Sequence, residues 1–381
     1  MKKSTIIIAA LAIILIVGIC LINKYSTNYA KNNTNKPVPN VALPDNTPVE
    51  TSPITDNINV EKVYTDAIEI LPTMDSISTS KNQVWTGAFQ MVWDDLAKEL
   101  NKAPIQFAGS QPEMVNLLNK SSFSVKDLSE NAYYKKWGLV SLQLKQEIEK
   151  GIWAKFREKS RILDSFDWTP EPDKYILYAM LKKDLEYIEK FNKLDDDYFE
   201  GIKTRIKYFG ITTDKYSKSK DSVQVLFYNN FNDLAITLKS KQGDLIHLYK
   251  TNSQKNLAEM YAEMKQKTKA EKDYLRAEDK FKAPILDFNT QREFKELYNR
   301  EIIPSGFIIN KAIEDIQFKM DNVGAKVVAE AAIMLSKGIA PAASMSTRYF
   351  YFTGPYAIFM EEPGKQPYFA AYITDPAPLQ K

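Results

Sequence analysis

The sequence almost lacks the two side chains that most nucleophilic and metal-binding sites require. Only one cysteine and one histidine occur in its 381 residues. Cys20 lies in an apolar N-terminal run, so the rest of the chain has no thiol and no disulfide. His247 would have to serve any catalytic triad or histidine-based metal site alone, and it occurs in an alternating apolar stretch without a serine motif. We therefore interpret His247 as structural, and predict no catalytic residue, no metal site and no cofactor.

An excess of charge of one sign is also missing. The chain has 51 basic and 48 acidic residues and a net charge of +3, which argues against a nucleic-acid partner. The three aspartates at 195–197 lack the spaced ligands and central glycine of a calcium loop, so we expect a solvated acidic turn. The two glutamates at 361–362 precede a Pro-Gly turn and are expected to face solvent. No pattern indicates oligomerisation, and we expect a monomer.

The N-terminus carries a long apolar run instead. Thr5 to Ile22 form 18 residues without charge or proline, which covers most of a bilayer's hydrocarbon core at about 1.5 Å per residue. The lysines at 2–3 favour the cytoplasmic side. Ile19 before Cys20 does not suit lipoprotein processing, and no good small-x-small cleavage site follows. We predict that residues 1–24 are an uncleaved anchor, with a removed signal or a lipoprotein as the alternative.

Residues 25–60 are rich in Asn, Thr and Pro and cannot bury enough surface to fold. We predict that they form a flexible stalk. The sequence therefore predicts a single-pass protein of the cell membrane, whose domain at 61–381 is extracellular.

This domain is predicted to have helices first and strands last. Apolar spacing predicts helices over 85–101 and 129–159, a buried stretch at 175–188 and a long charged helix over 254–280. Runs of β-branched and aromatic residues between turn signals predict strands. They lie at 223–228, 234–240, 244–249, 281–288, 313–320, 347–352, 355–361 and 368–374. This order indicates an α+β fold.

The segment after Gly324 fits two structures. Read with period two, alternate residues from 325 to 335 form an uninterrupted apolar face, which could enter the middle of a sheet. The same segment is rich in helix formers, and Gly338 after Lys337 would end a helix. Periodicity alone does not choose between them.

The segment and its flanks resemble the serpin family. Within that family, the chain would be a divergent member of bacterial type. An apolar strand leads through the turn at 321–323 to a hinge glycine, Gly324, and then Ala325. An aromatic strand, a Pro-aromatic pair, a hydrophobic strand, a turn and a final strand follow, ending near 376. The resemblance is clearest over 275–376 and depends on the order and spacing of these motifs. It implies helices packed on large, mainly antiparallel sheets, with an exposed reactive-centre loop.

The resemblance also implies a function. A serine or cysteine protease outside the cell would cleave the loop at 324–346, and the hinge end would insert as a new strand, carrying the acylated protease with it. The protein would be an inhibitor and not an enzyme. The hinge residues implied are Gly324, Ala325, Val327, Ala329 and Ala331.

The bond that would be cut has two possible positions. Counting 14 residues from the hinge glycine places it near Gly338 and Ile339. A shift of one residue would place Lys337 before the bond, which would invite trypsin-like enzymes.

Two other functions remain open. Val328 and Glu330 are bulkier or more charged than a serpin hinge is expected to be, which favours a non-inhibitory serpin-fold module that binds partners or has a structural role. In that case the loop would be a fixed helix. A third possibility is an extracellular hydrolase that uses carboxylates alone, whose spacing is set only in three dimensions.

Overall fold

The computed structural model describes residues 64–80, 82–211, 218–252, 255–326 and 347–380. The anchor predicted at 1–24 and the stalk predicted at 25–60 lie outside these residues. Among the described residues, no helix is both long and apolar enough to cross a bilayer.

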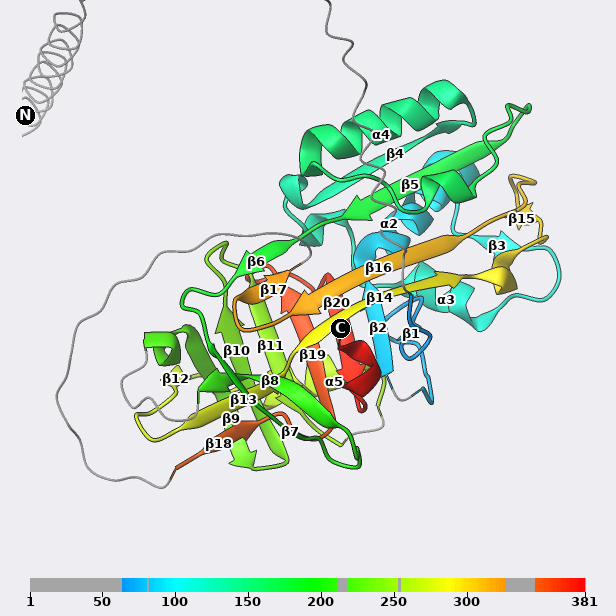
Figure 1. Cartoon of the computed structure of the whole chain (residues 1–381). Coiled ribbons are helices and arrows are strands. Elements are labelled where there is room, and N and C mark those ends of the chain that lie inside the picture. Colours follow the sequence, from blue (N-terminus) through cyan, green and yellow to red (C-terminus); the bar gives the residue numbers. More distant parts are fainter. Residues whose placement is uncertain (1–63, 81, 212–217, 253–254, 327–346, 381) are drawn as a thin grey trace, which may run out of the picture. The chain divides into compact units, whose positions relative to one another are not determined.

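The largest sheet has eight strands (Figure 1). In spatial order they are β1 (Glu69–Ile70), β2 (Asn82–Thr86), β20 (Phe369–Ile373), β19 (Tyr356–Glu361), β11 (Leu245–Lys250), β10 (Asp233–Lys239), β9 (Val223–Asn230) and β12 (Asp273–Tyr274). All of its pairings are antiparallel except that of β1 with β2.

Two smaller sheets have four strands each. One has the order β18 (Tyr349–Tyr351), β13 (Lys280–Pro284), β8 (Arg205–Ile211) and β7 (Asn192–Tyr198). The other has the order β14 (Leu286–Glu293), β16 (Ile313–Met320), β17 (Gly324–Lys326) and β6 (Asp184–Glu186). Two further pairs are β15 (Ile302–Ile303) with β3 (Gln106–Phe107), and β4 (Tyr133–Leu139) with β5 (Tyr175–Leu181).

The α-helices of the described residues are α2 (Gly87–Asp95), α3 (Glu113–Lys120), α4 (Leu142–Phe156) and α5 (Leu257–Lys267). A π-helical turn, Leu96–Asn101, continues α2. Short 3₁₀ turns occur at Val125–Asp127, Glu130–Ala132, Leu163–Ser165, Lys218–Ser222, Lys295–Leu297 and Ala377–Leu379. The α+β class and the mainly antiparallel sheets are thus confirmed. Each predicted strand window also contains a strand.

Three predicted helices differ from the structure. The first begins at Gly87, because Thr86 ends β2 and caps α2 through its side chain. Residues 133–139 form β4, because pairing with β5 outweighs their helical spacing. The long helix ends at Lys267, and β12 then pairs with β9.

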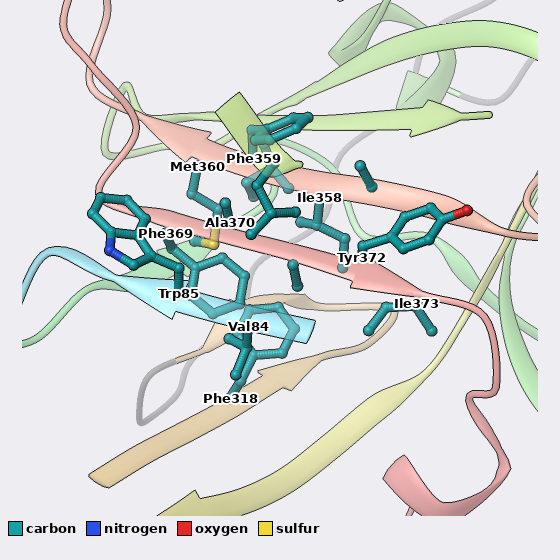
Figure 2. Close-up of a cluster of buried hydrophobic side chains, with 14 of the residues drawn as sticks. Val84, Trp85, Phe318, Ile358, Phe359, Met360, Phe369, Ala370, Tyr372 and Ile373 are labelled. Atoms are coloured by element: carbon teal, nitrogen blue, oxygen red, sulfur yellow. The ribbon is translucent and has the colours of Figure 1, made fainter. Parts of the chain in front are cut away.

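One main core joins the sheets. Alternate residues of β16 are buried, and among them Phe318 stacks on Phe369 of β20 with ring centroids 4.4 Å apart. Figure 2 shows both rings beside Val84, Trp85 and Met360. The packing of β16 therefore depends directly on the eight-stranded sheet.

A second apolar cluster lies between α4 and the β4–β5 pair. Ile148 and Ile152 of α4 are fully buried there, together with Leu163 and Tyr178. Figure 1 shows α4 alongside these strands. The α4–β4–β5 unit thus has packing of its own beside the main core.

Candidate functional site

The candidate site is the position of β17 within its sheet. Ala325 pairs with Met320 of β16 on one side and with Leu185 of β6 on the other, both antiparallel. Consequently β6 and β16 run parallel to each other, separated by β17. The first residues of the predicted loop therefore form a short central strand.

A tight turn connects β16 to β17. The Asp321 side chain accepts a hydrogen bond from the Val323 amide at 2.8 Å, and the Asp321 amide donates to the Gly324 carbonyl at 3.0 Å. The residues that follow β6 also hold this turn. The Tyr187 amide donates to the Val323 carbonyl, and the Phe191 amide donates to the Asn322 carbonyl. The start of β17 is thus fixed on both sides.

A glycine is required at position 324 because the backbone of β6 lies very close to it. A Cβ atom at this position would lie 2.0 Å from the Leu185 carbonyl oxygen of β6, a distance that no real side chain shows. The neighbouring Ala325 is fully buried and fits the narrow space inside the sheet. Small residues at 324–325 therefore have a packing reason that is independent of any family pattern.

Beyond β17, the sheet has no described continuation. Figure 1 shows β5 leading into β6 and β16 leading into β17. In the part of the chain that the structure describes, no backbone pairing joins β5 to β16, and α2 packs against β5. We call the region between these two strands, which no described pairing joins, the β5–β16 boundary. Arg161 and Asp315 form an ion pair across it, with Nη1 and Oδ1 3.0 Å apart.

A buried lysine fixes the junction between β5 and β6. Lys183 Nζ lies 2.8 Å from Asp244 Oδ2 and 2.6 Å from Glu362 Oε1. The Tyr368 hydroxyl donates to the same Asp244 oxygen at 2.8 Å, and Ser129 donates to Glu362 through its amide and hydroxyl. The strand that receives β17 is thus held to the ends of β11 and β19.

The charges of this lysine cluster are balanced. Burial would raise the pKa of Glu362, but hydrogen bonds from Lys183, Ser129 and Lys365 outweigh burial and lower the pKa to about 2. The carboxylate is therefore ionised at neutral pH, and Lys183 is its buried counter-ion.

The prediction that both glutamates at 361–362 face solvent is wrong. Glu361 is 2% exposed, because β19 lies between β11 and β20 in the eight-stranded sheet. Lys265 Nζ lies 2.8 Å from Glu361 Oε1, the Tyr261 hydroxyl donates to Oε2, and His247 Nε2 is 3.3 Å from Oε1. A helix cation and a hydroxyl thus compensate the buried charge.

His247 is a buried side chain of the sheet. Its Nδ1 shares a hydrogen bond of 2.8 Å with Thr237 Oγ1, and burial lowers the pKa of the imidazole. This arrangement agrees with the structural role predicted for it. The aspartates at 195–197 lie in the exposed strand β7 and not in a turn, and Asp197 pairs with Lys282 at 2.5 Å.

The structure covers the predicted site only in part. Gly324 and Ala325 lie together in β17. Val327, Ala329, Ala331, Lys337, Gly338 and Ile339 lie outside the described residues. Lys183 and its partners were not predicted, because they come from distant parts of the sequence and no local pattern relates them.

Comparison with known proteins gives structural relatives only. No protein-family model matches the sequence, and no curated protein matches it either. Serpin48, a highly specific serpin of the insect Tenebrio molitor, is 11% identical with a TM-score of 0.48, over 77% of this chain and 92% of that one. Human thyroxine-binding globulin in complex with its ligand is 10% identical with a TM-score of 0.46, over 78% and 93%. Mouse protein-Z dependent protease inhibitor is 12% identical with a TM-score of 0.41, over 62% and 63%.

Serpins are thus among the solved structures that this chain resembles.

Replacing Gly324 tests the close approach in β17. Gly324→Ala should displace β17 from β6 and lower the free energy of unfolding by about 1–3 kcal/mol, the usual cost of overpacking. Denaturant unfolding and amide exchange at Leu185 measure the two effects. Gly138→Ala is the matched control, because its Cβ would meet only a leucine methyl group at 3.3 Å. Equal protection of Leu185 in wild type and Gly324→Ala would contradict the packing argument.

Removing the buried lysine tests the junction of β5 and β6. Lys183→Met removes the buried cation shared by the Asp244 and Glu362 carboxylates and leaves Glu362 with only the partly exposed Lys365. This should lower the free energy of unfolding by about 3–5 kcal/mol at pH 7. Lowering the pH toward 2 protonates Glu362, so the difference from wild type should shrink. Denaturant midpoints at pH 7, 4 and 2 measure this. A constant difference across that range would show that charge is not the cause.

Proposed function

We propose that the domain is a serpin-type inhibitor of an extracellular serine or cysteine protease. Cleavage of the segment at 324–346 would release its hinge end, which would insert between β16 and the β5–β6 strand. The observation that carries this proposal is the position of Gly324–Lys326, which already pairs with β16 and β6. No side chain of the inhibitor needs to perform chemistry in this mechanism.

The register of β17 supports the proposal. Lys326 pairs with Lys319, so each further residue would meet the preceding residue of β16. Val327 would then face Phe318, and Ala329 would face Ile316, both of which are buried. The apolar face of the sequence would therefore meet the core side of β16.

The energy for insertion would come from backbone pairing. In the described structure, one edge of β5 pairs with β4, and β16 pairs with β14 along its whole length but with β17 only at one end. A strand continuing from β17 would supply donors and acceptors to both facing edges. Insertion would also bury the apolar face described above.

One observation favours the second candidate, a non-inhibitory binding or structural module. In the same register Glu330 would lie directly opposite Asp315. Like charges opposite each other in a sheet are destabilising. This repulsion would slow insertion unless Arg161, which contacts Asp315, also neutralises the new carboxylate.

Protease trapping tests the first proposal. The full chain is incubated with a trypsin-like and a subtilisin-like protease, and a denaturant-resistant covalent complex is expected with at least one. Cleavage of the loop should also raise the melting temperature. The absence of a complex, together with an unchanged melting temperature, would overturn insertion. A higher melting temperature without a complex would show an insertable loop that does not trap.

Two adjacent substitutions sharpen this test. Ala329→Asp would bring a charge onto the core side of the sheet, so it should convert the inhibitor into a substrate. Val328→Asp would place the same charge on the outer side and should retain more of the complex. Lys337→Ala tests which bond is cut. If only the trapping of trypsin-like proteases is lost, Lys337 occupies the position before the cut bond.

We further propose that residues 1–24 anchor the chain in the cell membrane, with residues 25–60 as a stalk and the domain outside. The apolar run at 5–22 supports this proposal. The full chain should remain with membranes after alkaline washing, and protease added to intact cells should remove the domain. A chain lacking residues 1–24 should not remain with the membranes. Retention of that shortened chain after washing would contradict the anchor.

A further inference from the structure

A cavity between α2 and α3 belongs neither to the β17 site nor to the lysine cluster. Its volume is about 510 Å³, which lies in the range of small-molecule sites. The lining residues come from α2 and the π-helical turn after it, from residues 102–104, from the end of α3 and from the serine-rich segment 121–124. All of these residues are described by the structure, so the polar groups that face the cavity can be identified.

Gln90 of α2 contributes an acceptor without a partner to this lining. Its side chain is 2% exposed, and its Nε2 donates to Asp94 Oδ1 at 2.7 Å and to the Leu118 carbonyl at 3.0 Å. Because both of these partners are acceptors, the amide orientation is fixed. The Oε1 atom is buried and has no hydrogen-bond partner among the described residues. A ligand that donates a hydrogen bond to this oxygen would remove the free-energy cost of leaving it unpaired.

Asp94 contributes a carboxylate without a counter-ion. Within the described chain, Gln90 is its hydrogen-bond partner and no lysine or arginine forms an ion pair with it. Burial is the largest influence on Asp94 and raises its pKa. The adjacent Asp95 differs, because Lys135 Nζ lies 2.6 Å from its Oδ1. A cation in the cavity would therefore supply to Asp94 what Lys135 supplies to Asp95.

The two acceptors lie side by side. The direct bond from Gln90 Nε2 to Asp94 Oδ1 places the amide and the carboxylate at one end of the cavity. An ammonium group has three N–H donors and a guanidinium group has five, so either could bond to both acceptors at once. A hydroxyl group has one donor and no charge, and an anion would be repelled by Asp94. The pair thus selects a cation that carries several N–H donors.

The rest of the lining limits what the cation is attached to. The buried rings of Trp93 and Phe123 form apolar walls, which suit a carbon chain, and aromatic rings also attract cations. Lys98 and Lys102 line the cavity too, but both are exposed, so water screens their charges more than that of Asp94. Their charges disfavour a second cationic group on the ligand.

A hydrogen-bonded pair holds the two helices in place around the cavity. The Trp93 indole N–H donates to Asn119 Oδ1 at 3.0 Å, and Asn119 Nδ2 donates to the Ile105 carbonyl at 2.7 Å. This chain of bonds joins α2, α3 and the segment between them. The acceptors are therefore presented by a preformed wall, which reduces the entropy lost on binding.

We propose that this cavity binds one primary ammonium or guanidinium group on a short carbon chain, with Asp94 as its counter-ion and the Gln90 amide oxygen as its second acceptor. A free amine and a lysine or arginine side chain of another protein share this chemistry. The site lies apart from the segment at 324–346, so the proposal does not depend on protease inhibition.

NMR titration of the full chain at neutral pH tests the proposal. Trp93 is one of five tryptophans, so its indole N–H signal can be followed after assignment with Trp93→Phe. Butylamine and butylguanidinium should shift this signal saturably, with a dissociation constant on the order of 1 mM. The signals of the exposed Trp137 and Trp153 should stay in place.

Two analogues separate the charge from the donors. 1-Butanol lacks the charge, and butyltrimethylammonium lacks N–H donors, so each should bind at least about tenfold more weakly than butylamine. Equal binding of butyltrimethylammonium would overturn the role of the two acceptors. A capped tripeptide with a central lysine distinguishes the sources. Binding as tight as that of butylamine would support a protein side chain, whereas much weaker binding would restrict the site to free amines.

Substitution of the counter-ion completes the test. Asp94→Asn keeps the size of the side chain and an acceptor for Gln90, so it should retain the fold and weaken butylamine binding at least about tenfold. Glu113→Gln is the matched control, because it removes an exposed carboxylate of α3 that does not line the cavity. Equal affinity in wild type and Asp94→Asn, or no saturable shift of Trp93 with either cation, would overturn the proposal. If Asp94→Asn did not fold, the comparison of the four small ligands on the wild type would still decide.

Discussion

The pairing of Gly324–Lys326 with two strands at once is the constraint on which the rest of the site depends. Three residues supply few hydrogen bonds, so their position must be fixed by their surroundings. The Asp321 turn fixes where the chain reverses, and the missing side chain of Gly324 lets β17 approach the Leu185 carbonyl. Because β6 and β16 are held apart by one strand at this end, the boundary beyond them has the direction and register that a longer strand would need.

Two buried ionisable groups lie on opposite sides of this geometry. Lys183 is compensated by two carboxylates and a network of donors, so it fixes the β5–β6 junction over a wide pH range. Glu314 accepts a hydrogen bond from the Thr86 hydroxyl at the start of α2, and burial raises its pKa to about 8. One end of the region therefore has ionised groups that compensate one another, whereas the other has a buried carboxyl group that burial favours in its neutral form.

The sequence predicted the strands better than the helices, for physical reasons. Buried strands such as β19 and β20 contain apolar residues in nearly every position, which leaves little ambiguity. Residues 133–139 were assigned to a helix because their partner β5 lies about 40 residues away and is invisible to local periodicity. The burial of Glu361 and Glu362 was not predicted for the same reason, because their cations come from distant parts of the sequence, in α5 and at the β5–β6 junction. Of the predicted site residues, only Gly324 and Ala325 lie among the described residues, and the close approach of β6 explains why a glycine stands at 324.

The sequence between β17 and β18 combines features that favour and oppose insertion. If the β17 register continued, the apolar residues 327, 329 and 331 would face the buried side of β16, which would favour burial. Its outward Glu330 would meet Asp315, which is already bound to Arg161 at the boundary. Inserting the strand would then require Arg161 either to serve two carboxylates or to leave one uncompensated. Since Arg161 belongs to the α4–β4–β5 unit, insertion should be sensitive to how that unit moves relative to β16.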